Sequence, residues 1–195
     1  MSDYRIIHPQ LGAVPVSSTG TTPLLPLGHR AQAQDIQTGS TNLGCGQFLY
    51  VVGVATGASS AAKGDLVMIK GDTVQQAGPA SSASVLPLGI AAGPLSGTNV
   101  YGWVQVRGLC DYAAMENATT DSFNAAGRAA TAFIGSGTDG NLATTQSATG
   151  QAIVGIGFPM GALTLTGSRS VWSTASFTGM TVQLFNPFVR GTSAF

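Results

Sequence analysis

Charged side chains are scarce in this chain of 195 residues: Asp, Glu, Lys and Arg fill 8% of positions, against about 25% in an ordinary soluble domain. Eight basic residues balance eight acidic ones, so the formal net charge is zero. A neutral chain has no basic stripe for a phosphate backbone, which excludes nucleic acid as a partner. Little charge also means little repulsion between molecules, so we expect much of the surface to lie against partners.

Long apolar segments and paired cysteines are missing as well. The longest apolar stretch, residues 48–58, is broken by glycines and is far shorter than the ~18 residues that cross a membrane. The opening MSDYRIIHPQ has no apolar signal core, so we expect neither a membrane partner nor secretion. Cys45 and Cys110 lack CxxC spacing, which favours free thiols in a reduced compartment over the alternative of one disulfide between them.

The residues that enzymes need are few and scattered. The two histidines, His8 and His29, lie in a proline-rich segment that is poorly suited to hold a general base. Residues 135–140 spell G-x-G-x-x-G, but no acidic residue follows Asp139 and the next residues form a poor helix, so a glycine-rich hairpin loop is the better interpretation. We therefore expect no catalytic residue, no cofactor and no metal ion.

Residues 1–44 differ from the rest of the chain, because prolines and glycines interrupt them while apolar residues follow no helical or strand period. This pattern predicts an extended N-terminal arm. The arm either orders against a partner, which we favour, or wraps its own domain. Its apolar side chains, together with one tryptophan, are the candidate interface with a partner or with another subunit: Tyr4, Ile6, Ile7, Leu24, Leu25, Leu27 and Trp103.

Residues 45–195 are predicted to be an all-β domain, either a small β-sandwich or a β-barrel. β-Branched and alternating runs separated by Gly, Ser, Thr and Asp clusters are typical of strands joined by tight turns. A weak helical pattern appears only at residues 115–126. The expected strands are residues 48–55, 65–70, 85–91, 99–107, 151–158, 162–166 and 180–188.

A faint internal repeat divides this domain. VLPLGIAAGPL and AIVGIGFPMGAL occupy similar places about 65 residues apart. The domain is therefore either two related β-units, residues 45–115 and 128–195, packed together, or one unit in which similar turns recur by chance.

Three segments carry a resemblance to a known family: KGDLVMIKGDTVQQAG, VLPLGIAAG and YGWVQVRGLCDYAAM. Their GDLV, LGIA and GWVQV motifs resemble those of the small β-domains of tailed-phage capsid decoration (cement) proteins. The resemblance covers residues 47–115 and, more loosely, residues 128–166.

The resemblance implies a non-enzymatic virion protein that is made in the host cytoplasm and binds the outer surface of the capsid. Its partners would be the major capsid protein and further copies of itself, as a homotrimer, and it would tie capsomers together against DNA pressure. Two alternatives stay open: another virion component (head fibre, minor capsid or tail-tube protein), or a carbohydrate-binding adhesive β-sandwich that stacks sugars on Trp103 or Trp172.

Overall fold

Ten segments of the chain are described by the computed structural model. They are residues 3–8, 12–37, 43–54, 61–77, 87–97, 99–114, 132–134, 142–143, 152–157 and 180–189.

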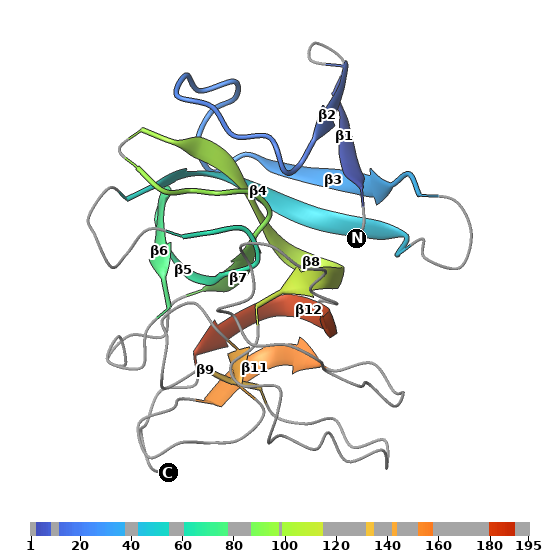
Figure 1. Cartoon of the computed structure of the whole chain (residues 1–195), viewed down its shortest axis with the longest axis vertical. Helices are drawn as coiled ribbons and strands as arrows, with labels where there is room; N and C mark the ends of the chain where they lie inside the picture. The colour runs from blue at the N-terminus through green and yellow to red at the C-terminus, as the bar shows by residue number, and fades with distance from the viewer. Residues whose placement is uncertain are drawn as a thin grey trace, which may run out of the picture.

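Every regular element in these segments is a β-strand, so the all-β class predicted from the sequence is confirmed (Figure 1). The strands are β1 (Tyr4–His8), β2 (Gly12–Pro15), β3 (Arg30–Asp35), β4 (Cys45–Gly53), β5 (Leu66–Lys70), β6 (Thr73–Gln76), β7 (Leu88–Ala91), β8 (Tyr101–Ala113), β9 (Ala132–Ile134), β10 (Leu142–Ala143), β11 (Ala152–Gly157) and β12 (Met180–Val189).

Five of these strands close into a barrel. Around the barrel the pairing runs β8–β7–β5–β6–β4, and β4 pairs with β8 to complete the circle. All of these pairings are antiparallel except that of β4 with β6. A two-residue turn joins β5 to β6, and its first residue, Gly71, has a φ of 62°. Such turns need a residue that tolerates positive φ at this position.

The barrel is filled by aliphatic side chains from alternate positions of its strands. Because successive side chains of a strand point to opposite faces, each strand contributes every second residue to this interior. The buried cluster inside the barrel, here called the barrel core, consists of Leu49, Val51, Ala61, Val67, Ile69, Val74, Ala91, Leu95, Val104 and Val106.

Glycines allow the barrel to close tightly around this core. A Cβ on Gly89 of β7 would lie 2.2 Å from Cγ1 of Val104, and a Cβ on Gly53 of β4 would lie 2.2 Å from the carbonyl oxygen of Leu95. Neither distance leaves room for a methyl group, so these two strands approach their neighbours only because the side chain is absent.

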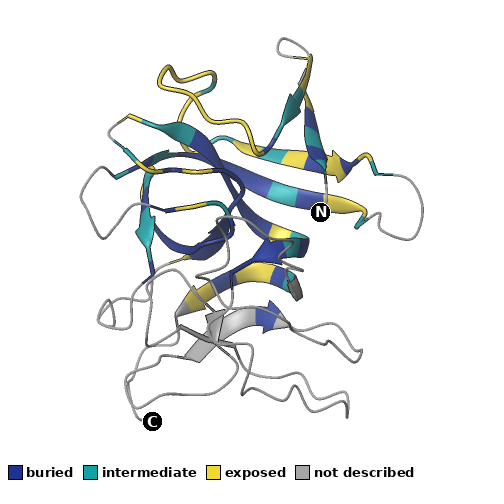
Figure 2. Ribbon diagram, in the orientation of Figure 1, coloured by how far each residue is buried: buried dark blue, intermediate teal, exposed yellow. Residues whose placement is uncertain are grey.

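The outer face of the barrel carries a second buried cluster. Phe48 of β4 and Trp103 of β8 belong to it, as do Tyr4 of β1 and Val182 and Leu184 of β12. Two extensions of the sheet supply the latter side chains: β3, β1 and β2 continue from β4, while β12, β11, β9 and β10 continue from β8. Burial on both faces accounts for the continuous buried stretches of β4, β5, β7 and β8 in Figure 2.

Most of the expected strands coincide with observed ones. Residues 48–55, 65–70, 85–91, 99–107, 151–158 and 180–188 overlap β4, β5, β7, β8, β11 and β12, in that order. The strand expected at residues 162–166, the helical pattern at 115–126 and the loop at 135–140 lie outside the described residues.

The described parts of residues 1–44 lie against the protein's own β-domain. Strands β1, β2 and β3 continue the sheet from β4, and the side chains of Tyr4 and Ile6 are buried. Contact between this segment and a partner stays a prediction. So does the duplication of a β-unit, because most of residues 128–179 lie outside the described part of the chain.

Replacing Gly89 by alanine should destabilise the barrel by about 1–3 kcal/mol, because the new methyl group must displace Val104 in a closely packed interior. Urea unfolding measures the difference. Gly20→Ala is the matched control, since the nearest atom to its new Cβ would be 3.7 Å away, and it should change stability by less than about 0.5 kcal/mol. Equal effects of the two substitutions would contradict this account of barrel closure.

Candidate functional site

Three of the seven predicted interface residues are buried within the chain itself. Tyr4 is 1% exposed, Ile6 3% and Trp103 2%. Tyr4 packs against Phe48 with ring centroids 5.3 Å apart, and its hydroxyl donates to the Leu109 carbonyl. Side chains this deeply buried offer no surface to a partner, so we leave these three out of the candidate site.

The other four predicted residues lie nearer the surface. Ile7 is 76% exposed, Leu24 56% and Leu27 36%. Leu25 is half-buried and packs against the outer cluster. Exposed apolar side chains that gather in one patch mark a contact site for another molecule, whereas single ones are normal on any surface.

Leu24 and Leu27 belong to one loop, residues 20–27, which we call the leucine loop. Backbone hydrogen bonds attach it to the barrel at both ends. At the start, Gly20 and Tyr101 each donate an N–H to the other's carbonyl. Just beyond its end, the Gly28 N–H donates to the Tyr50 carbonyl (2.9 Å) and the Tyr50 N–H donates to the carbonyl of His29 (2.8 Å).

A further bond holds the middle of the leucine loop. The Leu24 N–H donates to the Tyr50 hydroxyl at 3.0 Å, and the flanking Pro23 and Pro26 restrict the backbone through their fixed φ angles. The loop therefore presents Leu24 and Leu27 from a stiff backbone, which lowers the entropy cost of contact with a partner.

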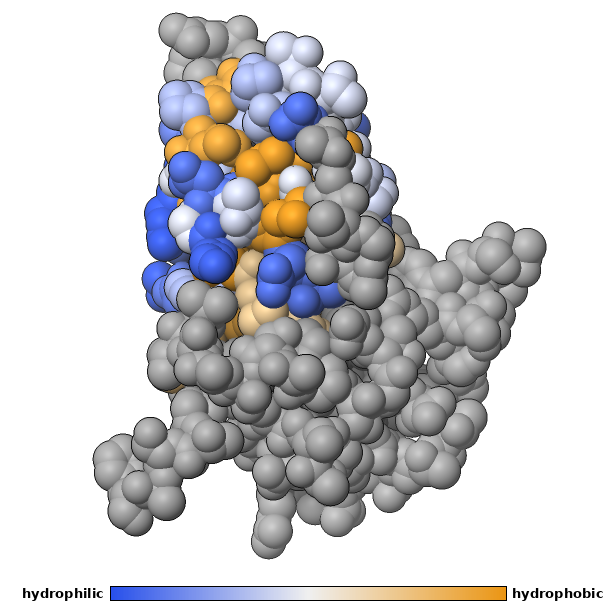
Figure 3. All heavy atoms as spheres, turned by 90° about the vertical axis from the view of Figure 1, so that its left-hand side faces the viewer, coloured by the Kyte–Doolittle hydropathy of each residue, from blue (hydrophilic) through white to orange (hydrophobic). Residues whose placement is uncertain are grey.

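An aromatic hollow of about 270 Å³ lies beside the leucine loop. Tyr50, Tyr101 and Trp103 line it, together with Leu24. The Tyr50 ring stacks on Tyr101 at 6.4 Å and meets Trp103 at 4.9 Å between centroids. Figure 3 views the side of the molecule on which the loop lies, and shows apolar residues gathered between hydrophilic ones there. The candidate site is the leucine loop with the half-buried Tyr101 beside it, whereas Tyr50 and Trp103 are buried behind this surface.

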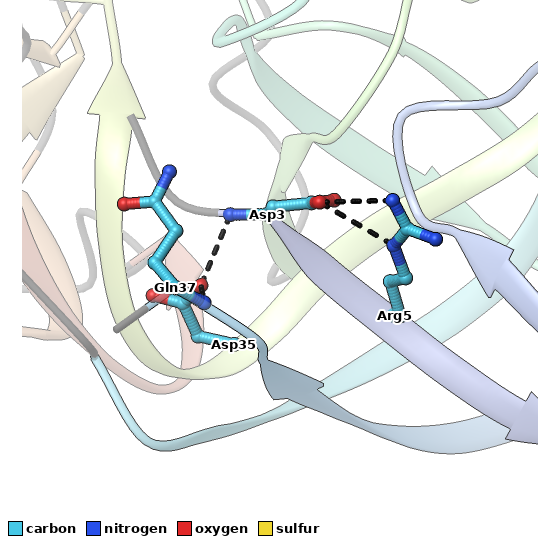
Figure 4. A network of polar contacts seen from close by, with 4 residues as sticks. All are labelled: Asp3, Arg5, Asp35 and Gln37. Atoms are coloured by element: carbon cyan, nitrogen blue, oxygen red, sulfur yellow. Dashed lines mark hydrogen bonds and ion pairs between the residues drawn. The ribbon is translucent and has the colours of Figure 1, made fainter.

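A buried carboxylate fixes the position of β1, the strand on which Ile7 lies. Asp35, at the end of β3, is fully buried. Its oxygens accept backbone N–H groups of Asp3 (3.0 Å), Gln37 (3.1 Å) and Leu43 (3.0 Å). Asp3 in turn forms an ion pair with Arg5 at 3.1 Å (Figure 4). The carboxylate thus joins β1, β3 and the approach to β4.

Other buried polar groups also hold strands together. The Tyr112 hydroxyl donates to Oε1 of Gln105 at 2.6 Å, and Nε2 of Gln105 donates to the Leu109 carbonyl at 2.8 Å. Burial raises the pKa of Tyr112 well above its ordinary value, and burial raises the pKa of the neighbouring Cys110 thiol to about 12. These groups are therefore uncharged at neutral pH, as hydrogen-bonded interior groups should be.

Within the described residues, no three His, Cys, Asp or Glu side chains come together as a metal site would require. The same part of the chain contains no helix that is long and apolar enough to cross a membrane. Cys45 is exposed, Cys110 is buried, and no disulfide joins them. Of the two histidines, the His29 ring meets the edge of Trp103 at 6.4 Å.

Comparisons with protein-family models, with curated proteins and with solved structures give no significant match. The resemblance to decoration proteins therefore depends on the quoted sequence motifs alone.

Several exposed apolar residues are not distinguished by the sequence pattern. Ile36, the residue after β3, is 49% exposed, and Phe185 and Phe188 on β12 are 57% and 38% exposed. The apolar pattern of β12 correctly predicts a strand, but the pattern does not say which of its two faces is covered. The packing of Val182 and Leu184 into the outer cluster decides this and leaves Phe185 exposed.

Replacing Asp35 by alanine should lower stability by about 2–4 kcal/mol, because three backbone N–H groups lose a charged acceptor in a buried place. Hydrogen exchange at the amides of Asp3, Gln37 and Leu43 should accelerate. Asp72→Ala, which removes an exposed carboxylate from a turn, is the control and should leave both measurements nearly unchanged. Unchanged exchange in the Asp35 variant would argue against the network.

The two thiols should differ in reactivity. At about pH 8, a thiol reagent should label Cys45 alone in the folded protein, because Cys110 is buried and its pKa of about 12 leaves almost no thiolate. Unfolding in guanidinium chloride should expose the second thiol. A Cys45→Ser variant should then show no labelling when folded, and rapid labelling of that variant would contradict the buried position of Cys110.

Proposed function

We propose that this protein is a structural virion component, a capsid decoration protein that binds the outer surface of a phage head and ties neighbouring capsomers together. The leucine loop is its principal contact with the major capsid protein. The observation that carries the proposal is the position of Leu24 and Leu27: both are exposed on a loop that five hydrogen bonds attach to a closed barrel.

The physical demands on a decoration protein agree with this surface. A protein that holds capsomers together against internal pressure needs a stable fold and high-affinity contacts with the shell. A closed barrel has no free edge between its own strands, and leucines gain about 1.5–3 kcal/mol each when they are fully buried. Many such contacts around one shell add up through avidity.

The scarcity of charge supports the same proposal. With 8% charged residues, little desolvation cost arises when large areas of this surface meet a shell or another copy of the chain. An association as a homotrimer fits this composition and is part of the proposal.

The sequence motifs of the resemblance occupy neighbouring strands. GDLV leads into β5, LGIA is β7, and GWVQV lies in β8. These three strands are adjacent in the barrel, since β7 pairs with both β5 and β8. The motifs therefore lie in one packed unit of this chain, and the proposal takes that unit as the part that resembles decoration proteins.

The alternative of a carbohydrate-binding adhesive protein depends on sugar stacking on Trp103 or Trp172, and the burial of Trp103 argues against the first of these. Sugar stacking needs an exposed aromatic face, whereas Trp103 is 2% exposed. Trp172 lies outside the described residues.

The proposal is tested by two measurements. The first is the copy number of this chain relative to the major capsid subunit in purified particles of its source. A ratio near one to one is expected for a protein spread over the whole shell. A handful of copies per particle would replace decoration with a vertex, fibre or tail role, and absence from particles would overturn a virion role altogether.

The second measurement is co-sedimentation of the purified protein with shells that lack it. A Leu24→Asp/Leu27→Asp variant should bind at least tenfold more weakly, because two apolar contacts become charged. Phe185→Asp is the matched control, because it places a charge at an apolar residue outside the leucine loop whose exposed fraction, 57%, is close to the 56% of Leu24. Equal binding by the double variant and the unchanged protein would remove the leucine loop from the interface.

A further inference from the structure

One end of the barrel opens into a second cavity, which we call the barrel mouth. Its volume is about 440 Å³, within the range of about 300–1,000 Å³ that is usual for small-molecule sites. Leu49, Ile69 and Val106 of the barrel core form its apolar floor. Asn186 and Pro187 of β12 form part of the wall.

The rim of the barrel mouth carries positive charge. Arg30, the first residue of β3, and Lys70, the last residue of β5, both line it and both are exposed. Neither forms an ion pair with any residue that the structure describes. Asp72 places a carboxylate near the cavity: its Oδ1 lies 3.3 Å from the position of a Cβ on Gly28, which also lines the cavity. Arg30 and Lys70 carry two positive charges and Asp72 carries one negative charge, so the net charge of these three side chains is +1.

We propose that the barrel mouth binds a small monocarboxylate with an apolar body, of the class of medium-chain alkanoates. The apolar chain would cover Leu49, Ile69 and Val106, and the carboxylate would meet Arg30 and Lys70 at the rim. The floor supplies the hydrophobic part of the affinity, and the guanidinium and ammonium groups supply charge-assisted hydrogen bonds to the carboxylate. Barrel mouths are among the places where such pockets are most often found.

This site is separate from the proposed capsid contact. None of the residues that line the barrel mouth belongs to the leucine loop, which ends at Leu27. Failure of one proposal therefore leaves the other standing.

The first test uses the unchanged protein and octanoate as the probe, followed by amide and methyl NMR spectra. Saturable shifts should concentrate on the floor and rim residues, with a Kd below about 1 mM. Octanol, which has the same chain and no charge, should bind at least tenfold more weakly, and octylamine should bind weakest. Equal binding of octanoate and octanol, shifts elsewhere on the protein, or no shifts at all would overturn the proposal.

The second test changes the rim. Arg30→Glu and Lys70→Glu should each weaken octanoate binding at least tenfold, because each replaces an attracting charge by a repelling one. Arg107→Glu is the matched control: Arg107 is an exposed arginine that does not line the cavity, and this variant should bind within about twofold of the unchanged protein. Equal losses in all three variants would mean that only net charge matters, and would overturn the assigned site.

Discussion

Closure of the barrel between β4 and β8 is the constraint on which the other features depend. The two strands pair over residues Gln47–Val52 and Tyr101–Arg107, and this pairing turns a sheet into a ring with an enclosed interior. A ring of five strands is narrow, so its interior accepts only aliphatic side chains, and glycines where strands lie closest. The aromatic hollow and the barrel mouth are both lined by strands of this closed barrel, so both depend on the pairing of β4 with β8.

The same two strands also connect the barrel to the rest of the sheet. β4 is nine residues long and β8 is thirteen, so each extends beyond the barrel and offers a free edge. β3 uses the edge of β4, and β12 uses the edge of β8. Segments from both ends of the chain are therefore held by the barrel, and their side chains cover its outer face. Apolar residues stay exposed on the side of these segments that faces away from the barrel, as at Ile7 and Phe185, and on the leucine loop.

The sequence predicts strands well where β-branched residues are dense, as in β4, β5 and β8. It misses β3, whose sequence RAQAQD has low strand propensity and forms a strand because β4 provides a partner along its length. The alternation of β8 also reveals two faces without revealing that both are covered. Val104 points into the barrel and Trp103 into the outer cluster, so the alternation alone does not distinguish a tryptophan on the surface from one that is covered by other strands.

Surface chemistry is harder to predict than strands because it depends on neighbours in space. Leu24 and Leu27 stand out in the sequence as apolar residues between prolines, and their exposure follows from backbone bonds that hold the loop on the barrel wall. Arg30 and Lys70 are forty residues apart and belong to strands that do not pair with each other, yet both reach the rim of one cavity. No local pattern records that proximity. A chain with so few charges places two cations together at an apolar opening, and this placement is what distinguishes the barrel mouth from an ordinary gap at the end of a barrel.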